Sequence, residues 1–138
     1  MEMGVARSPH RDEAETLRRR AKDFLELARE ASRLENYDIS CFLSEQAAQL
    51  HLKSVLLEEV GDYPRTHSVR NLLTEISKSF MGEEIREFTH TNRVRLIALE
   101  DSYIIARYTP TTYTMEDAED MISLAEETIR LTSKVQKK

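Results

Sequence analysis

Residues 42–68 read FLSEQAAQLHLKSVLLEEVGDYPRTHS, and the first part of this stretch predicts a helix at the centre of the protein. At about 100° per residue, apolar side chains surround most of the helix, as is typical of a helix packed on nearly all sides. The apolar positions are Cys41, Leu43, Ala47, Ala48, Leu50, Leu52, Val55 and Leu57. One narrow stripe holds Gln46, Gln49 and Lys53, and we expect these polar side chains to find partners inside the protein or at an interface.

Apolar residues recur every three or four positions in four other segments, which predicts an amphipathic helix in each. The segments are 13–34, 83–108, 114–133 and a shorter one that begins at Thr66 or Ser68. Glycine and proline residues mark the expected ends of the second, third and fourth helices, because neither residue continues a helix well. These residues are Gly61 with Pro64, Gly82, and Pro110.

The helix order predicts an all-α protein, an up-and-down antiparallel bundle of about five helices. Residues 36–40 are expected to connect the first helix to the central one. Thr114 and Asp117 match a capping box, with Asp in place of the usual Glu, that starts the last helix. We expect residues 1–11 to be a flexible leader and residues 12–138 to form a single domain.

The composition agrees with one soluble domain. The chain has 138 residues, of which 40% are hydrophobic and 33% charged, and this length leaves no room for a second domain. Only 3 glycines and 3 prolines are present, too few for the turns of a many-stranded sheet. A net charge of −5 argues against a broad surface for nucleic acid, so no stable DNA binding is expected.

The sequence predicts a cytoplasmic protein that does not enter membranes. No stretch approaches the roughly 18 consecutive apolar residues of a membrane span, and the first residues are polar. Cys41 is the single cysteine, which excludes an intrachain disulfide and a thiolate zinc site.

Motifs for metal, cofactor or catalytic chemistry are weak. Glu87 and His90 have the Glu-x-x-His spacing of di-iron bundles, but the second copy that such a site needs is missing. Arg86, His90 and Arg93 share a stripe that would attract phosphate, and a solvated helix face explains them more simply. His51 and His67 have no nucleophile at a diagnostic spacing, and there is no glycine-rich phosphate loop. We therefore expect no metal, no cofactor and no catalytic residue.

Two neighbouring residues, Arg107 and Tyr108, precede an irregular loop and are candidates for a ligand site. The arginine offers a fork for phosphate and the tyrosine a stacking face for a base. They equally fit a structural role, in which Arg107 pairs with helix-terminal carbonyls and Tyr108 covers the core. Lys53 needs a counter-charge on a central helix, and a phosphate, Glu100 or Asp101 would supply it. The candidates for nucleotide or phosphate binding are Arg107, Tyr108, Lys53 and Gln46.

An ordered series of short motifs resembles the HEPN domain, named for higher eukaryotes and prokaryotes nucleotide binding. The motifs are Glu45-Gln46-Ala47-Ala48-Gln49-Leu50 with Lys53, Tyr63-Pro64, Thr66-His67-Ser68, Ala106-Arg107-Tyr108 and Tyr113-Thr114. The resemblance extends over about residues 14–131. It implies an up-and-down helical bundle that commonly dimerises and is often encoded beside a minimal nucleotidyltransferase, as a toxin-antitoxin-like pair. Nucleotide binding and RNA cleavage are both proposed for the family.

The ribonuclease branch of this family carries an Arg, four to six intervening residues and then a His. Counted from Arg107, the His would stand at Thr112, Tyr113 or Thr114, and none of these is histidine. General acid-base cleavage without the imidazole would be slower by about a hundredfold or more. The chain most resembles the branch with Arg-Tyr-Pro at the end of the fourth helix, although Thr109 here separates the tyrosine from the proline.

The expected function is that of a non-catalytic helical binding module. We expect a homodimer, because Ile97 and Ile104 lie off the main apolar face of their helix. The ligand would be a nucleotide, and a minimal nucleotidyltransferase would be the protein partner. Two alternatives remain: a ribonuclease toxin with a degenerate active site, and a purely structural homodimer whose polar stripe is satisfied across the interface.

Overall fold

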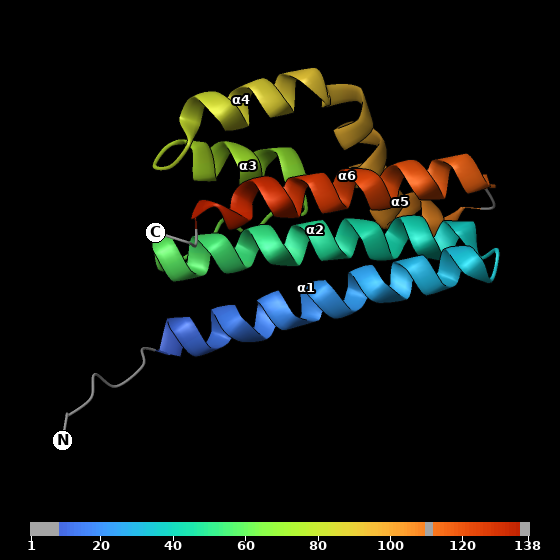
Figure 1. Ribbon diagram of the computed structural model, residues 1–138, viewed down its shortest axis with the longest axis horizontal. Helices are drawn as coiled ribbons and strands as arrows, with labels where there is room; N and C mark the ends of the chain where they lie inside the picture. Colours follow the sequence, from blue (N-terminus) through green and yellow to red (C-terminus); the bar gives the residue numbers. More distant parts are fainter. Residues whose placement is uncertain (1–8, 110–111, 136–138) are drawn as a thin grey trace.

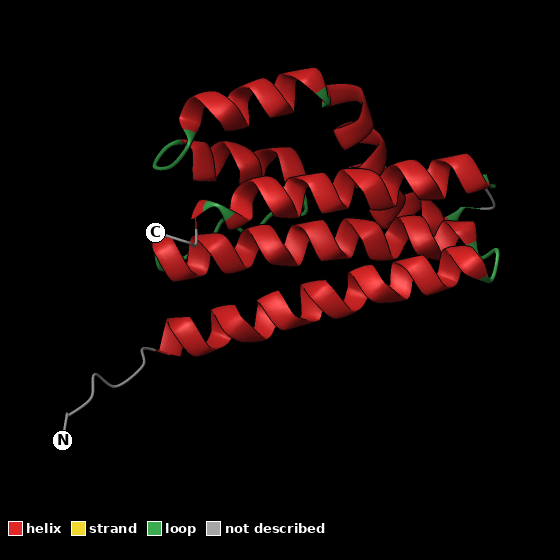
Figure 2. Ribbon diagram, viewed as in Figure 1, coloured by secondary structure: helices red, strands yellow, loops and turns green. Residues whose placement is uncertain are grey.

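Helices α1 to α6 make up the secondary structure of the residues that the structure describes. The structure is a computed structural model that describes residues 9–109 and 112–135, without the side chains of Pro9 and Arg107. The helices are α1 Pro9–Arg33, α2 Tyr37–Glu59, α3 Val69–Ser77, α4 Gly82–Thr91, α5 Arg93–Tyr108 and α6 Met115–Ser133 (Figures 1 and 2). The prediction of an all-α bundle is confirmed. None of these helices is long and apolar enough to cross a membrane.

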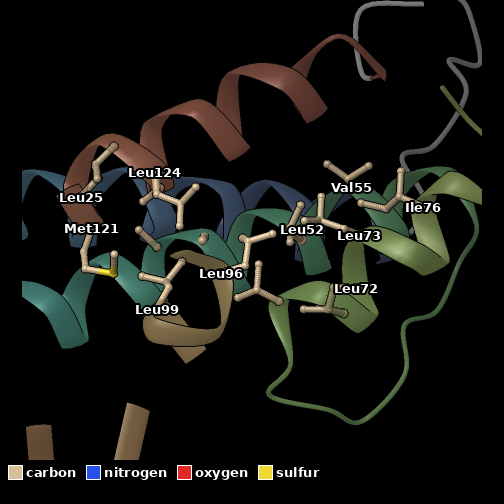
Figure 3. Packing of buried hydrophobic residues seen from close by; sticks show 14 of the residues in the cluster. Leu25, Leu52, Val55, Leu72, Leu73, Ile76, Leu96, Leu99, Met121 and Leu124 are labelled. Atoms are coloured by element: carbon tan, nitrogen blue, oxygen red, sulfur yellow. The ribbon is translucent and has the colours of Figure 1, made fainter. Parts of the chain in front are cut away.

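Helix α2 is the central element, as its apolar pattern predicts. Helices α1 and α6 lie along it in Figure 1, α5 packs against it from behind, and α3 contacts it below α4. The core side chains from these helices meet in one cluster, which includes Leu52 of α2, Leu72 of α3, Leu96 of α5 and Leu124 of α6 (Figure 3). Each is fully buried, and burial of such a side chain stabilises the fold by about 1.5–3 kcal/mol.

The helix starts that the sequence predicts are present, with two shifts. Thr114 and Asp117 form the reciprocal capping box of α6, and the Ser68 side chain caps α3. Helix α2 begins at Tyr37, so the expected connection at 36–40 is wrong, and the short turn contains Glu35 with a left-handed φ of 65°. Helix α1 begins at Pro9, within the segment expected to be a leader, and residues 1–8 lie outside the described residues.

The predicted long helix 83–108 is two helices, α4 and α5, with a break at Asn92. The backbone leaves helical geometry at Asn92, with φ −104° and ψ 20°, while its side chain and its backbone N–H both donate 3.0 Å hydrogen bonds to the Phe88 carbonyl. The bend lets α4 pack on α3 while α5 packs on α2. The apolar repeat continues through the break, which is why the sequence pattern conceals it.

Gly82 is the first residue of α4 and does not end α3, which stops at Ser77. Met81 before it adopts a left-handed φ of 49°. A Cβ atom on Gly82 would lie 2.9 Å from the Ser77 carbonyl oxygen, so the absence of a side chain permits this close connection. Helix α5 ends at Tyr108, and the expected stop at Pro110 lies outside the described residues.

Candidate ligand-binding site

The segment from Gly61 to Ser68 folds back beside α2 and forms one wall of the candidate site. Gly61 begins the reversal with a φ of 96°, a left-handed value that glycine adopts without strain. At the other end, the Ser68 hydroxyl donates a 3.3 Å hydrogen bond to Glu100 of α5. The loop therefore carries its aromatic and cationic side chains toward α2 and α5.

A salt bridge between Arg70 and Glu100 holds the end of this loop. The Arg70 guanidinium donates two hydrogen bonds to the Glu100 carboxylate, at 2.9 and 3.1 Å, and the Arg70 backbone N–H donates a third at 2.9 Å. A paired fork of this kind fixes orientation as well as distance. The start of α3 is thus tied to α5, with the loop between them.

A buried polar network lies on α2 behind the loop. Glu45 is fully buried and accepts hydrogen bonds from Gln46 Nε2 at 2.8 Å and from Gln49 Nε2 at 2.6 Å. Lys53 Nζ donates to Gln49 Oε1 at 2.9 Å, so the amide relays the charge of Lys53 toward Glu45. The predicted polar stripe has found its partners inside the bundle.

Burial raises the pKa of Glu45 to about 7, because the charged carboxylate loses its water. The hydrogen bonds from Gln46 and Gln49 and the charge of Lys53 oppose this rise, whereas the charge of Glu100 adds to it. Near neutral pH the carboxyl group is therefore poised between its protonated and ionised forms.

Lys53 lies against the ring of Tyr63. Its Nζ atom is 5.3 Å from the ring centroid, and Arg65 approaches the same ring at 5.4 Å. Burial lowers the pKa of Lys53, an effect that Glu45 opposes and Arg65 increases. The loop has therefore brought a second cation close to Lys53, and both cations lie over the ring of Tyr63.

The counter-charge of Lys53 is Glu45, reached through Gln49. Glu100 is committed to Arg70, and in the described part of the chain Lys53 forms no ion pair with Glu100 or Asp101. The prediction that Glu100 or Asp101 balances the charge of Lys53 is therefore wrong. A carboxylate does balance it, but that carboxylate is Glu45.

His67 completes the surface at the end of the loop. Its ring stacks on Tyr103 of α5 with centroids 4.3 Å apart and planes inclined by 25°. The Tyr103 ring also lies beside the Phe42 ring of α2, with centroids 6.1 Å apart. His67 is exposed, so its imidazole faces solvent beside a tyrosine ring.

The candidate residues from the sequence fall into two groups. Lys53 and Gln46 belong to the α2 network, whereas Tyr108 is 69% exposed at the end of α5. Arg107 lies in α5, and its side chain is outside the described residues. Within one chain the two groups are separate.

The crossing of α2 and α5 gives the scale of this separation. Ser102 donates a 3.2 Å hydrogen bond to the Cys41 carbonyl, which marks where the two helices cross. At about 1.5 Å per residue, Lys53 lies roughly 18 Å from this point along α2, and Tyr108 roughly 9 Å along α5. Because Glu100, on the other side of Ser102, is the part of α5 that acts on Glu45, the Tyr108 end of α5 lies on the side of the crossing away from Lys53.

The sequence pattern does not identify Glu45, Arg65 and Tyr103 as residues of the site. Glu45 offered a signal, since it is a carboxylate next to the polar stripe on a helix that is otherwise almost entirely apolar. Arg65 and Tyr103 offered none, because their positions depend on the loop folding back between α2 and α5.

Comparison with known proteins gives the chain a family. The HEPN domain family matches residues 14–135, nearly the whole chain. An archaeal HEPN homologue of known crystal structure, ST0689, is 25% identical, with a TM-score of 0.65 over 87% of this chain and 94% of that one. TT1696 from Thermus thermophilus has the same fold, at 24% identity and a TM-score of 0.73 over 88% of this chain and 97% of that one. No curated protein matches. The resemblance read from the short motifs is confirmed, and the chain belongs to the HEPN domain family.

Proposed function

We propose that this HEPN domain is a non-catalytic module that binds a nucleotide by its phosphates. The observation that carries the proposal is the approach of Lys53 and Arg65 to the ring of Tyr63, with a second pair, His67 stacked on Tyr103, further along the same loop. Cationic side chains bind phosphate oxygens, and tyrosine rings stack on bases. The protein as a whole is acidic, so a small local cluster suits a mononucleotide better than a long nucleic acid.

Gln46 is suited to hold the same ligand. It donates one amide proton to Glu45 and makes no further hydrogen bond within the described residues. A second amide proton and the amide oxygen thus remain for a ligand hydroxyl or base edge. Gln46 is half-buried in the single chain, so part of its side chain lies at the surface.

The proposed assembly is a homodimer formed through one face of α2. This face, the exposed α2 stripe, consists of Ile39, Phe42, Leu43, Gln46, Leu50 and Lys53, all of which are at least partly accessible. Apolar side chains with this much exposure on a central helix support a second copy as the partner that covers them. Ile104 of α5 is 56% exposed and extends the apolar area.

A twofold arrangement of the stripes also gives the residues at the end of α5 a role. In a twofold dimer with antiparallel α2 helices, the Lys53 end of one copy lies beside the Ile39 end of the other. Helix α5 ends on that side, so Arg107 and Tyr108 of the second copy would join the nucleotide site. A minimal nucleotidyltransferase is the further partner that we propose from the family, and a neighbouring reading frame that encodes one would support it.

Calorimetry with ATP tests the ligand. We expect Lys53→Gln and Arg65→Gln each to weaken binding by about 1.5–3 kcal/mol, roughly tenfold to a hundredfold, the scale of a charge-assisted hydrogen bond. Arg130→Gln is the matched control, since Arg130 is an exposed arginine on α6, which carries none of the residues of the proposed site. Absence of heat with the parent protein, or equal losses in all three variants, contradicts the proposal.

Sedimentation equilibrium tests the dimer independently. The parent should be dimeric at micromolar concentration, and Ile39→Glu should be monomeric with an unchanged helical circular dichroism spectrum. Ile39 is 45% exposed in the single chain and does not belong to the core cluster, so the substitution should leave the core intact. A monomeric parent refutes the dimer and leaves the calorimetry unaffected.

A further inference from the structure

A cavity lies between α3 and α4, which pack against each other (Figure 1). Its volume is about 200 Å³. The nucleotide site proposed above shares none of its residues. The residues that line it are Thr74 and Ser77 of α3, Ile85, Arg86, Thr89 and His90 of α4, and Arg93 of α5.

The lining of this cavity contains three basic side chains and no carboxylate. Arg86, His90 and Arg93 are all exposed. On α3, Arg70 pairs with Glu100, but in the part of the chain that the structure describes neither Arg86 nor Arg93 forms an ion pair. The whole chain has a net charge of −5, so the cavity keeps a local positive charge that no ion pair balances.

The Arg86 side chain folds back along α4 toward the end of α3. A Cβ atom on Gly82 would lie 2.9 Å from Arg86 Nη1 and 2.9 Å from the Ser77 carbonyl oxygen. The guanidinium therefore lies over the bare Cα of Gly82, close to the Ser77 wall of the cavity. Glu83 stands three positions before Arg86, a spacing at which helix ion pairs form, yet the two do not pair. A solvated helix face, the simpler explanation from the sequence, does not account for this orientation.

The hydrogen bonds of the lining favour a ligand that accepts rather than donates. The Ser77 hydroxyl donates to the Thr74 carbonyl at 2.6 Å, and the Thr89 hydroxyl donates to the Ile85 carbonyl at 2.8 Å. Those two protons are thus committed. The Thr74 hydroxyl, the two guanidinium groups and the imidazole make no hydrogen bond within the described residues and remain as donors. An anion with several acceptor oxygens matches this set.

We propose that this cavity binds a diphosphate group. Guanidinium groups form paired hydrogen bonds to phosphate oxygens, and Arg86 and Arg93 supply one each. Arg86 and His90 are roughly 6 Å apart along α4, at about 1.5 Å per residue, and Arg93 follows beyond the break at Asn92. The volume equals about seven water molecules at roughly 30 Å³ each, more than a single phosphate group occupies. Inorganic pyrophosphate and the diphosphate of a nucleotide share the required chemistry.

The test titrates the full chain with sodium pyrophosphate in magnesium-free buffer and follows nitrogen-proton spectra. Pyrophosphate should shift the amide resonances of residues 74–93 and the His90 ring resonances saturably. Orthophosphate at equal ionic strength should bind about tenfold more weakly, because it reaches fewer of the donors. ADP distinguishes the two sources of the group. Affinity equal to that of pyrophosphate supports a site for the diphosphate of a nucleotide, and weaker binding supports a site for the free ion.

Substitutions locate the site. Arg86→Gln and Arg93→Gln should each weaken pyrophosphate binding about tenfold or more, and Arg86→Lys about threefold, because lysine keeps the charge but loses the planar fork. Arg19→Gln is the matched control and should bind as the parent does, since Arg19 is exposed on α1 and does not line the cavity. Lys53→Gln should also bind pyrophosphate as the parent does, which separates this site from the nucleotide site.

Four outcomes would overturn the proposal. The first is no saturable shift in residues 74–93 up to about 10 mM pyrophosphate, which would leave only a solvated basic face. The second is equal affinity for orthophosphate, which would reduce the site to one for a single oxyanion. The third is an equal loss in Arg19→Gln and Arg86→Gln, which would reduce the attraction to general surface charge. The fourth is a loss in Lys53→Gln, which would assign the pyrophosphate to the nucleotide site.

Discussion

Helix α2 carries two buried titratable side chains, Glu45 and His51, and they differ in how their hydrogen bonds are satisfied. Glu45 receives both of its side-chain partners from its own helix, from Gln46 and Gln49. His51 faces α1 and α6 instead, and its Nε2 atom is unpartnered in the described chain. A polar group that finds partners on its own helix is complete once that helix forms. One that depends on neighbouring helices is complete only if they supply a donor or acceptor.

The same cause, burial, moves the two pKa values in opposite directions. The carboxyl group is charged when it loses its proton, so burial raises the pKa of Glu45 from 4.5 to about 7. The imidazole is charged when it gains a proton, so burial lowers the pKa of His51 from 6.5 to about 4. Their effects on stability should therefore oppose each other in the mildly acidic range.

Glu45→Gln should reveal the pH dependence that His51 contributes to the free energy of unfolding. In the parent, the folded state keeps the Glu45 proton up to about pH 7, so this group's contribution to stability falls by about 3 kcal/mol as the pH rises from 4.5 to 7. The Glu45→Gln variant lacks this decrease in stability with rising pH. Urea unfolding from pH 4 to 8 should show its stability rising with pH relative to the parent.

An exposed carboxylate on the same helix provides the control for this experiment. Glu59→Gln should follow the parent curve, because Glu59 lies outside the buried network. A Glu45→Gln curve parallel to that of the parent would contradict the assignment of a raised pKa to Glu45.

His51→Leu should have the opposite effect and about the same size. The folded parent excludes a proton from His51, so stability from this group is lost by about 3 kcal/mol as the pH falls from 6.5 to 4. Without the imidazole, the variant should gain stability relative to the parent in acid. The double variant with Glu45→Gln should show neither slope, and a double variant that retains one would show that the two groups are not its sources.

Glu100→Gln should lower the stability of the protein and change the pH dependence that Glu45 contributes to it. Loss of the charged pair with Arg70 should destabilise the protein by about 1–2 kcal/mol, since both side chains are partly accessible to solvent. Glu100 also raises the pKa of Glu45, so the pH slope assigned to Glu45 should move to lower pH. An unchanged slope would mean that the two carboxylates do not interact.

The smallest expected effect is on RNA. We expect the purified protein to leave generic RNA intact, because no histidine stands at 112, 113 or 114 after Arg107. Arg107→Ala should then change nothing in a gel assay. Degradation that disappears in this variant would contradict the expectation, and degradation that persists would point to a contaminant.

The sequence predicts most of the architecture, because much of it rests on local patterns. Three features depend only on residues close together in the sequence, and the structure has all three. They are the apolar circumference of α2, the Ser68 cap and the Thr114 capping box. The sequence pattern does not reveal the break at Asn92, because the backbone leaves helical geometry at this one residue without changing the apolar repeat.

The candidate site is less predictable, because it depends on contacts between distant segments. Arg70 and Glu100 are 30 positions apart, and their pairing fixes the loop that places Arg65 and His67. Spacing identified Lys53 and Gln46 as polar residues of a central helix, but it could not reveal that Glu45 joins them. The role predicted for Arg107 and Tyr108 stays a prediction.

The position of α6 has a consequence for synthesis of the protein. Helix α6 packs against α2 and is joined to α1 by the pair of Arg29 and Glu126, which are 97 positions apart. The ribosome completes α2 at Glu59 and α6 at Ser133. At roughly 5–20 residues per second, the α1–α2 hairpin waits about 4–15 seconds for the helix that covers it. During that interval the nascent chain exposes the apolar side of α2, which makes it a natural client for chaperones that bind hydrophobic segments on the ribosome.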